Sequence, residues 1–246
     1  MMAQTKVHAL LPLKDLVSAK TRLGGVLRPS ERRALAQAMV EDVLQTLTSH
    51  PQVSRVTLVS DDPGADLLSC KYGIDFLDER SLNCRGLNPV LEKACDRLAT
   101  GPDDITLILH GDIPLLSAGD IDAALSKREA TSGLLIGCDR LRQGTNLLMF
   151  DSLSRPEFNF GSDSCDKHVK AARRAGIAVS VFHTLAIGLD VDEPADLTLL
   201  MAELDPQLGN HTANLLLGTP LGKRIEVQVG DTDAGTTYSH NGETQV

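Results

Sequence analysis

The sequence predicts an α/β fold with a mostly parallel, mixed sheet sandwiched by helices. In the first half, short apolar runs rich in β-branched residues alternate with segments of helical period, as in βαβ units. The run from Ile105 to Leu109 is apolar throughout, which is typical of a strand buried on both faces of a parallel sheet. In the second half, two strand-like runs follow each other with no helix between them. This part of the sheet should depart from simple βα alternation.

The elements of the first half follow from periodicity and from start and stop signals. In the longest helix, Leu35, Met39, Val43 and Leu47 fall four residues apart, behind Pro29 and Ser30 at its start. The full expected order is strand 6–13, helix 29–50, strand 55–60, helix 65–72, strand 74–77, helix 89–98, strand 105–109 and helix 117–129.

The second half continues with strands 133–137 and 147–150, helix 165–175, strand 177–182, a strand-like run at 185–189 and helix 194–204. After Asp205 the apolar periodicity fades, and the stretch from Gly222 onward is polar. The sequence therefore predicts one domain over residues 1–204 and a partly disordered C-terminal extension over residues 205–246.

Composition excludes several classes of protein. A formal net charge of −9 disfavours nucleic-acid binding, which needs a basic face. The first apolar run, Val7 to Leu13, is too short for a signal peptide or a membrane span. Five cysteines, an odd number without a C-x-x-C pair, favour reduced thiols over disulfides or a zinc site. These features predict a cytoplasmic protein with no membrane partner.

Asp112 is the first candidate for chemistry. It follows the strand 105–109, where Gly111 permits a tight exit and Pro114 prevents further pairing. In open α/β sheets, ligands bind at the carboxyl ends of the strands, and a carboxylate there suits Mg²⁺ that carries nucleotide phosphates. The alternative role, capping the next helix, fits Ser117 better, because Asp120 completes a capping box with it.

Asp190 is the second candidate, since it also follows an apolar strand-like run and precedes a helix. Two carboxylates from separate strand ends can share one Mg²⁺ or hold two. The alternative is that Asp190 and Asp192 cap the helix that begins at Pro194. Capping suits Asp192 and leaves Asp190 available as a metal ligand.

Two further segments carry groups suited to anions. Lys14, Lys20 and Arg22 follow the first strand, where phosphate-binding loops lie in α/β folds, although neither a Walker loop nor G-x-G-x-x-G is present. Exposed cations are usually only solvated, and that alternative stays open. In the second half, Gly144-Thr145-Asn146 and the loop 160–164 offer backbone and hydroxyl donors, and Ser164 starts a helix whose N-terminus favours an anion. An ordinary polar loop before a capped helix is equally compatible with this pattern.

These residues give the chain a specific resemblance to the 2-phospholactate or phosphoenolpyruvate guanylyltransferases of coenzyme F420 biosynthesis. The matching motifs keep the family's order over about residues 7 to 200. They are Leu11-Pro-Leu-Lys14, Ala19-Lys-Thr-Arg-Leu23, Ser30-Glu-Arg-Arg33, Ser60-Asp-Asp62, Gly86-Leu-Asn88, His110-Gly-Asp-Ile-Pro114, Gly144-Thr-Asn146, Phe160-Gly161 through Ser164 to His168, and Asp190-Val-Asp-Glu-Pro194.

The resemblance implies a nucleotidyltransferase fold of the glycosyltransferase A type and transfer of GMP from GTP to the phosphate of a small phospho-acid, with Mg²⁺. It implies metal ligands at Asp112 and Asp190, both catalytic together with Lys20 and Arg22. Acceptor contacts would fall on Lys14, Thr145, Gly161 and Ser164. Nucleotide contacts would fall on Lys20, Arg22, Asp61, Gly86 and Asn88.

The chain departs from the family pattern on the acceptor side, at Arg142-Gln-Gly-Thr-Asn146, Cys165 and Lys167. The acceptor is therefore left open among 2-phospholactate, phosphoenolpyruvate and 3-phosphoglycerate. The product would pass to the next enzyme of the pathway, and a homodimer is left open. The alternatives are a molybdopterin guanylyltransferase or sugar-phosphate cytidylyltransferase of the same fold, and a non-catalytic nucleotide-binding module.

Overall fold

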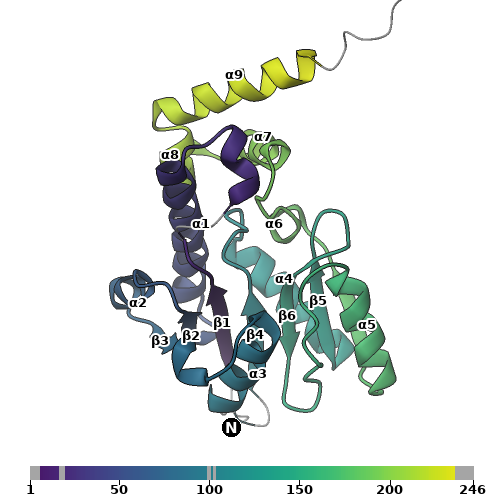
Figure 1. Cartoon of the computed structure of the whole chain (residues 1–246). Helices are drawn as coiled ribbons and strands as arrows, with labels where there is room; N and C mark the ends of the chain where they lie inside the picture. The colour runs from purple at the N-terminus through teal and green to yellow at the C-terminus, as the bar shows by residue number, and fades with distance from the viewer. Residues whose placement is uncertain (1–5, 17–19, 99–100, 102–103, 236–246) are drawn as a thin grey trace, which may run out of the picture.

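A seven-stranded mixed sheet lies at the centre of the computed structural model, which describes residues 6–16, 20–98, 101 and 104–235 (Figure 1). The strand order is β3-β2-β1-β4-β6-β5-β7. The strands are β1 (Val7–Leu13), β2 (Val53–Ser60), β3 (Asp75–Asp78), β4 (Ile105–Leu109), β5 (Leu134–Cys138), β6 (Thr145–Phe150) and β7 (Val179–Phe182). The predicted α/β class is confirmed.

Strand β6 is the one that runs against its neighbours. It pairs antiparallel with both β4 and β5, whereas the other neighbouring strands pair in parallel. The turn between β5 and β6 spans only residues 139–144. A parallel crossover needs a dozen or more residues, so this connection has to be a hairpin. The predicted departure from βα alternation is therefore confirmed.

Helices cover both faces of the sheet. They are α1 (Pro29–Ser49), α2 (Ala65–Tyr72), α3 (Leu87–Leu98), α4 (Ala118–Thr131), α5 (Ser164–Arg174), α6 (Leu185–Gly188), α7 (Pro194–Glu203), α8 (His211–Leu216) and α9 (Pro220–Gly235), with short 3₁₀ turns η1 (Thr21–Gly25), η2 (Glu79–Leu82) and η3 (Pro206–Leu208). In β1, Leu11 packs in one apolar cluster with α1, and Leu10 packs in another with α3 and α5. Alternate side chains thus serve opposite faces, which is why the central strands are apolar throughout.

Two sequence predictions are wrong. Most of the run 185–189 forms the one-turn helix α6 (Leu185–Gly188), not a strand, because the Thr184 side chain accepts a hydrogen bond from the Ile187 backbone and caps the turn. The expected loss of an apolar face after Asp205 also fails. Leu216 of α8 and Ile225 of α9 are each 1% exposed and pack in a third apolar cluster.

This third cluster lies beyond the carboxyl end of β1, where α7, α8 and α9 gather around η1 and the start of α1 (Figure 1). The division into a domain over residues 1–204 and a C-terminal extension over residues 205–246 stays a prediction. The expected disorder, so far as it concerns residues 236–246, falls outside the described residues. No helix in the described part of the chain combines the length and the apolar character needed to cross a bilayer.

Candidate functional site

Asp112 lies where the sequence predicts it, just beyond the carboxyl end of β4. Gly111 permits the turn to pack against α1, because a Cβ there would lie 2.8 Å from Cγ2 of Val40. The backbone oxygen of Asp112 accepts a hydrogen bond from the Val191 nitrogen at 3.2 Å. That bond brings the segment carrying Asp190 and Asp192 alongside the end of β4.

Lys20 joins the two segments. Its Nζ lies 2.5 Å from Oδ2 of Asp112 and 2.8 Å from Oδ1 of Asp192. Burial alone would lower the Lys20 pKa, but the two carboxylates outweigh burial and raise it. Burial would raise the pKa of Asp112, and Lys20 in turn holds it below its usual value. The pair is therefore charged at neutral pH.

Asp190 has a different environment. Its Oδ1 accepts a hydrogen bond from Nδ2 of Asn146 at 3.2 Å, and the same amide also donates to the Ile187 carbonyl. Burial, followed by the negative charge of Asp112, raises the Asp190 pKa to about 6. The two carboxylates repel each other, and a cation between them would relieve this repulsion.

One atom of this cluster is unsatisfied. Oδ1 of Asp112 is buried and has no hydrogen-bond partner among the described residues. Such an atom needs a physical explanation, and a bound cation would satisfy it. No group of three or more His, Cys, Asp or Glu side chains in the described part of the chain is suited to a metal. Mg²⁺ nonetheless commonly binds one or two carboxylates and completes its shell with water and substrate phosphates, so the donors present fit it.

The sequence interpretation of Asp192 is wrong. The cap of α7 is Glu193, whose backbone nitrogen donates to Asp196 Oδ2 at 2.8 Å in a capping box. This frees Asp192 to pair with Lys20. The sequence signal was there, because Glu193 and Asp196 have the spacing of a capping box. Asp190 also follows helix α6 and not a strand, so the expected pair of strand ends is half correct.

Pockets surround the cluster. One of about 290 Å³ is lined by Lys14, Lys20, His110, Asp112 and Asp192, among others. Another, of about 300 Å³, contains Arg22 and Asp190 and shares Asp192 with the first. Asp112, Asp190, Lys20, Lys14 and Arg22 therefore converge as predicted. The guanidinium of Arg22 lies 3.5 Å from Glu193 and is mostly exposed.

His110 could not be assigned from sequence. His110 is half-buried, its Nε2 atom is buried without a hydrogen-bond partner in the described structure, and desolvation lowers its pKa. Its ring meets Phe160 edge to face at 5.3 Å, and Phe160 meets His168 at 5.0 Å. This row of rings connects the Asp112 pocket to the second-half loops. Adjacency to the Gly111-Asp112 turn was the only available signal.

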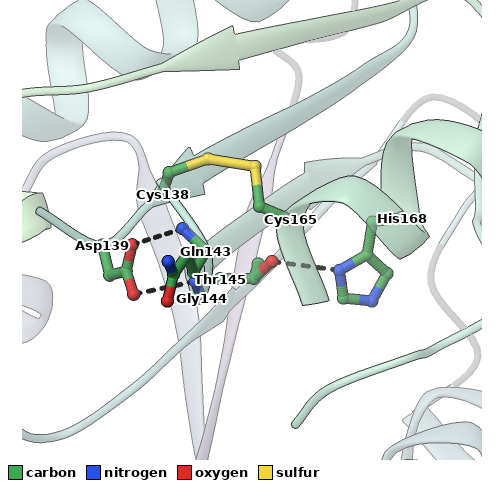
Figure 2. The surroundings of a disulfide bond; sticks show 7 residues. All are labelled: Cys138, Asp139, Gln143, Gly144, Thr145, Cys165 and His168. Atoms are coloured by element: carbon green, nitrogen blue, oxygen red, sulfur yellow. Dashed lines mark hydrogen bonds between the residues drawn. A yellow bond between two sulfur atoms is a disulfide. The ribbon is translucent and has the colours of Figure 1, made fainter. Parts of the chain in front are cut away.

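The second-half loops converge on His168. The backbone N–H of Asn159 donates to Nε2, so we infer that the ring proton is on Nδ1, which faces Thr145 Oγ1 at 3.1 Å (Figure 2). Burial lowers the His168 pKa to about 4, so the ring is neutral. Thr145 then accepts from His168 and keeps its own hydroxyl proton to donate. Thr145 and Ser164 are only 4% and 2% exposed, so these two predicted acceptor residues are buried, and neither lines one of the two pockets at the charged cluster.

Cys138 and Cys165 form a disulfide between the end of β5 and the first turn of α5 (Figure 2). The prediction of reduced thiols is wrong for this pair, whose Cα atoms lie 6.1 Å apart, within bridging range. Pairing across 27 residues depends on how β5 and α5 pack, which spacing cannot reveal. Beside the disulfide, the Asp139 carboxylate accepts hydrogen bonds from the backbone nitrogens of Gln143 and Gly144 and shapes the turn before Thr145.

The remaining predicted residues lie on neighbouring loops. Both polar groups of the Asn88 amide bond the Phe160 backbone, so Asn88 clamps the two loops together. Gly86 and Gly161 adopt φ of +92° and +123°, conformations that favour glycine. Asp61 follows β2 and lines a separate pocket. Contact with nucleotide or acceptor stays a prediction for all four residues.

The His168 environment predicts a pH-dependent stability. Because its folded pKa of about 4 is below the ordinary 6.5, its contribution is present above pH 6.5 and is lost as pH falls toward 4. We expect the drop in unfolding free energy between pH 7 and 4.5 to be roughly 2 kcal/mol smaller in His168→Gln than in wild type. Urea titrations at both pH values measure this, with the exposed His183→Gln as control. An equal drop in His168→Gln and wild type would contradict it.

Comparisons with known proteins show the fold and the family of this chain. The structure resembles that of a nucleotide-diphospho-sugar transferase from Desulfovibrio desulfuricans G20, with a TM-score of 0.75 at 20% identity, covering 91% of this chain and 98% of that one. It also resembles a cytidylyltransferase from Leptospira borgpetersenii, with a TM-score of 0.54 at 13% identity, covering 97% and 100%. At these identities the likeness concerns the fold alone, and it confirms the predicted fold class.

Sequence relatives are more specific. The phosphoenolpyruvate guanylyltransferase of Conexibacter woesei is 35% identical over 211 residues, 85% of this chain and 94% of that protein. The 2-phospho-L-lactate guanylyltransferase of Methanothermobacter thermautotrophicus is 34% identical over 194 residues, 78% and 82% of the two chains. The family described as "Guanylyl transferase CofC like" matches residues 7–219. The chain therefore belongs to the CofC-like guanylyl transferase family.

Proposed function

We propose that the protein transfers GMP from GTP to the phosphate of a small phospho-acid, releasing pyrophosphate, as a step of coenzyme F420 biosynthesis. Family membership supports the reaction class. The structural observation that carries the proposal is the cluster of Asp112, Asp190 and Lys20 at the carboxyl edge of the sheet, with the unpaired Oδ1 of Asp112 in its centre.

The reaction exchanges one phosphoanhydride bond for another. An oxygen of the acceptor phosphate attacks the α-phosphorus of GTP, and the bond to the β-phosphate oxygen breaks in line with it. No covalent enzyme intermediate is needed, so the protein acts by positioning and charge. Lys20 and Arg22 would hold the leaving pyrophosphate, and Lys14 lines the same pocket as Lys20.

Asp112 and Asp190 would hold Mg²⁺. When bound, the ion would neutralise charge on the phosphates and fix their arrangement. The chain's own contribution is preorganisation. Asn146 orients Asp190, and the bond from the Val191 nitrogen keeps the two carboxylates side by side.

The test is mass spectrometry of products from GTP, or CTP in parallel, with Mg²⁺ and each of three acids, namely phosphoenolpyruvate, 2-phospholactate and 3-phosphoglycerate. It is coupled to the next pathway enzyme, because the product is expected to be unstable. A guanylyl diphosphate ester of one acid, with pyrophosphate, is the expected outcome. If GTP binds but no pyrophosphate is released with any of the acids, the protein is a non-catalytic module. Turnover only with CTP would indicate a cytidylyltransferase.

The acceptor assignment gives a second prediction. Thr145→Val and Ser164→Ala should lower kcat/KM for the phospho-acid at least about tenfold, because each removes a donor or its support beside a charged ligand. The Kd for GTP·Mg²⁺ should change little. Calorimetry with a non-hydrolysable GTP analogue, beside steady-state kinetics, measures both, and the exposed Ser162→Ala is the control. Lower GTP affinity with unchanged acid kinetics would assign these residues to the nucleotide.

We propose further that the reaction takes place in the cytoplasm, where GTP is available, and that the product passes to the next enzyme of the pathway. The partners are thus GTP and a small phospho-acid, with no nucleic acid or membrane. Sedimentation of the purified protein decides between a monomer and a homodimer.

A further inference from the structure

A third pocket has no role in the group transfer described above. It has a volume of about 610 Å³ and is lined by Asp61, Glu79, Arg80, Asn83, Cys84 and Arg85. These residues follow the carboxyl ends of β2 and β3, on the same edge of the sheet as Asp112. The pocket is thus on the ligand-binding edge, but toward β3.

The spacing suits the far end of a nucleotide. From β3 to β4 there are three strand-to-strand steps, and at about 4.8 Å per step they span roughly 14 Å. An extended nucleoside triphosphate covers a comparable length from base to phosphates. Lys14, after β1, lies between the two ends. It lines the Asp112 pocket, and its charge also acts on Glu79.

Glu79 contributes an unpaired carboxylate to this pocket. Its side chain is half-buried and makes no hydrogen bond or ion pair within the described residues. Burial, followed by the charge of Asp61, raises its pKa. The backbone around it is fixed, because Asp78 caps η2, Arg80 donates to the Asp61 carbonyl at 2.7 Å and Lys93 donates to the Leu82 carbonyl at 2.8 Å. A rigid, unpaired acceptor favours binding by reducing the entropy cost.

We propose that Glu79 reads the guanine base of the substrate, accepting hydrogen bonds from N1–H and the 2-amino group, while Arg85 donates toward O6 and N7. The inference rests on the proposed GTP specificity and names the residues that produce it. Arg85, like Glu79, has no hydrogen-bonding partner within the described part of the chain, and it lines the same pocket.

This chemistry discriminates guanine from adenine and cytosine. Guanine presents two adjacent donors on its pairing edge, and a carboxylate presents two acceptors. Adenine and cytosine each present an acceptor beside their amino donor, so one carboxylate oxygen would face a lone pair. An unpaired buried polar contact is a strong source of discrimination.

The test exchanges a hydrogen-bond donor for an acceptor on the base, and an acceptor for a donor at residue 79. Xanthosine triphosphate (XTP) carries a 2-oxo acceptor in place of the 2-amino donor, and Glu79→Gln places an amide donor opposite it. We expect Glu79→Gln to lower kcat/KM for GTP at least about tenfold and to raise it for XTP, shifting the GTP-to-XTP ratio at least about a hundredfold. Asp61→Asn removes the same charge from the same pocket and should leave that ratio within about threefold, whatever its effect on both substrates.

An unchanged ratio in Glu79→Gln, or a shifted ratio in Asp61→Asn, overturns the assignment. The ratio of calorimetric Kd values for GTP and XTP, measured without acceptor, separates this result from the proposed function. If wild type turns over no acid, the proposed transfer fails, yet the Kd ratio still decides whether Glu79 reads the base. A general collapse of the pocket would weaken both nucleotides and could not produce a gain with XTP.

Discussion

Asp112→Asn and Asp190→Asn are each expected to lower turnover at least about a hundredfold while the fold is retained. The amide is a poor ligand for Mg²⁺, and it carries no charge to balance Lys20 or a bound cation. In wild type, Asp112 offers one oxygen to Lys20 at 2.5 Å and leaves the other unpaired in the buried centre of the cluster. An amide in place of this carboxylate would retain at most one neutral acceptor there.

The matched comparison is Asp192→Asn. Asp192 also pairs with Lys20, at 2.8 Å, but its side chain is 46% exposed, compared with 27% for Asp112. We expect this variant to lose less activity, because Lys20 keeps Asp112. Pyrophosphate release measures activity, and the midpoint of thermal unfolding monitors the fold. Near-normal release from Asp112→Asn or Asp190→Asn would remove that residue from the proposed metal site. An equal loss in Asp192→Asn would assign the effect to the position of Lys20.

The sequence predicted much of this site for a simple reason. Asp112 follows an unbroken apolar strand and a glycine, and this local pattern fixes its place at the edge of the sheet. Asp190 was identified through the wrong element, because the apolar residues of α6 are as compatible with a strand as with one helical turn. The position of Lys20 between two carboxylates is a tertiary fact, and no local pattern contains it.

In the fold, too, the features set by a local sequence pattern could be predicted, and those set by tertiary packing could not. The antiparallel direction of β6 could be predicted from the sequence, because the connection from β5 is too short for a crossover. The Cys138–Cys165 disulfide could not be predicted from the sequence, because it depends on the packing of α5 against the sheet. The C-terminal helices were missed because each contributes few apolar residues. They become a hydrophobic face only together with α1, η1 and α7.

Removal of those helices is the other change with a large expected effect. A chain ending at Asp205 should lose at least about 5 kcal/mol of unfolding free energy. Leu216 and Ile225, each 1% exposed, would no longer cover the third cluster. Asp42 is 5% exposed and accepts hydrogen bonds from the backbone nitrogens of His211 at 2.6 Å and Thr212 at 2.9 Å, so truncation would also leave a buried carboxylate without these partners.

Activity should fall with stability, because the same cluster supports the site. Leu23 of η1 is fully buried in it three residues after Lys20, and Val191 is buried in it between Asp190 and Asp192. Uncovering the cluster would therefore loosen both segments that carry the charged groups. A chain ending at Gly235 retains α8 and α9 and is the control, expected to unfold like wild type.

Leu216→Ala gives a graded version of the same test, with an expected cost of about 2–5 kcal/mol and a partial loss of activity. Urea unfolding and pyrophosphate release are measured on wild type, on Leu216→Ala and on the chains ending at Asp205 and Gly235. If the chain ending at Asp205 keeps both its unfolding midpoint and its activity, the third cluster is dispensable. The domain boundary that the sequence places between residues 204 and 205 would then be correct. If instead Leu216→Ala and the truncation reduce stability and activity in parallel, α8 and α9 are part of the catalytic domain, and that boundary is wrong.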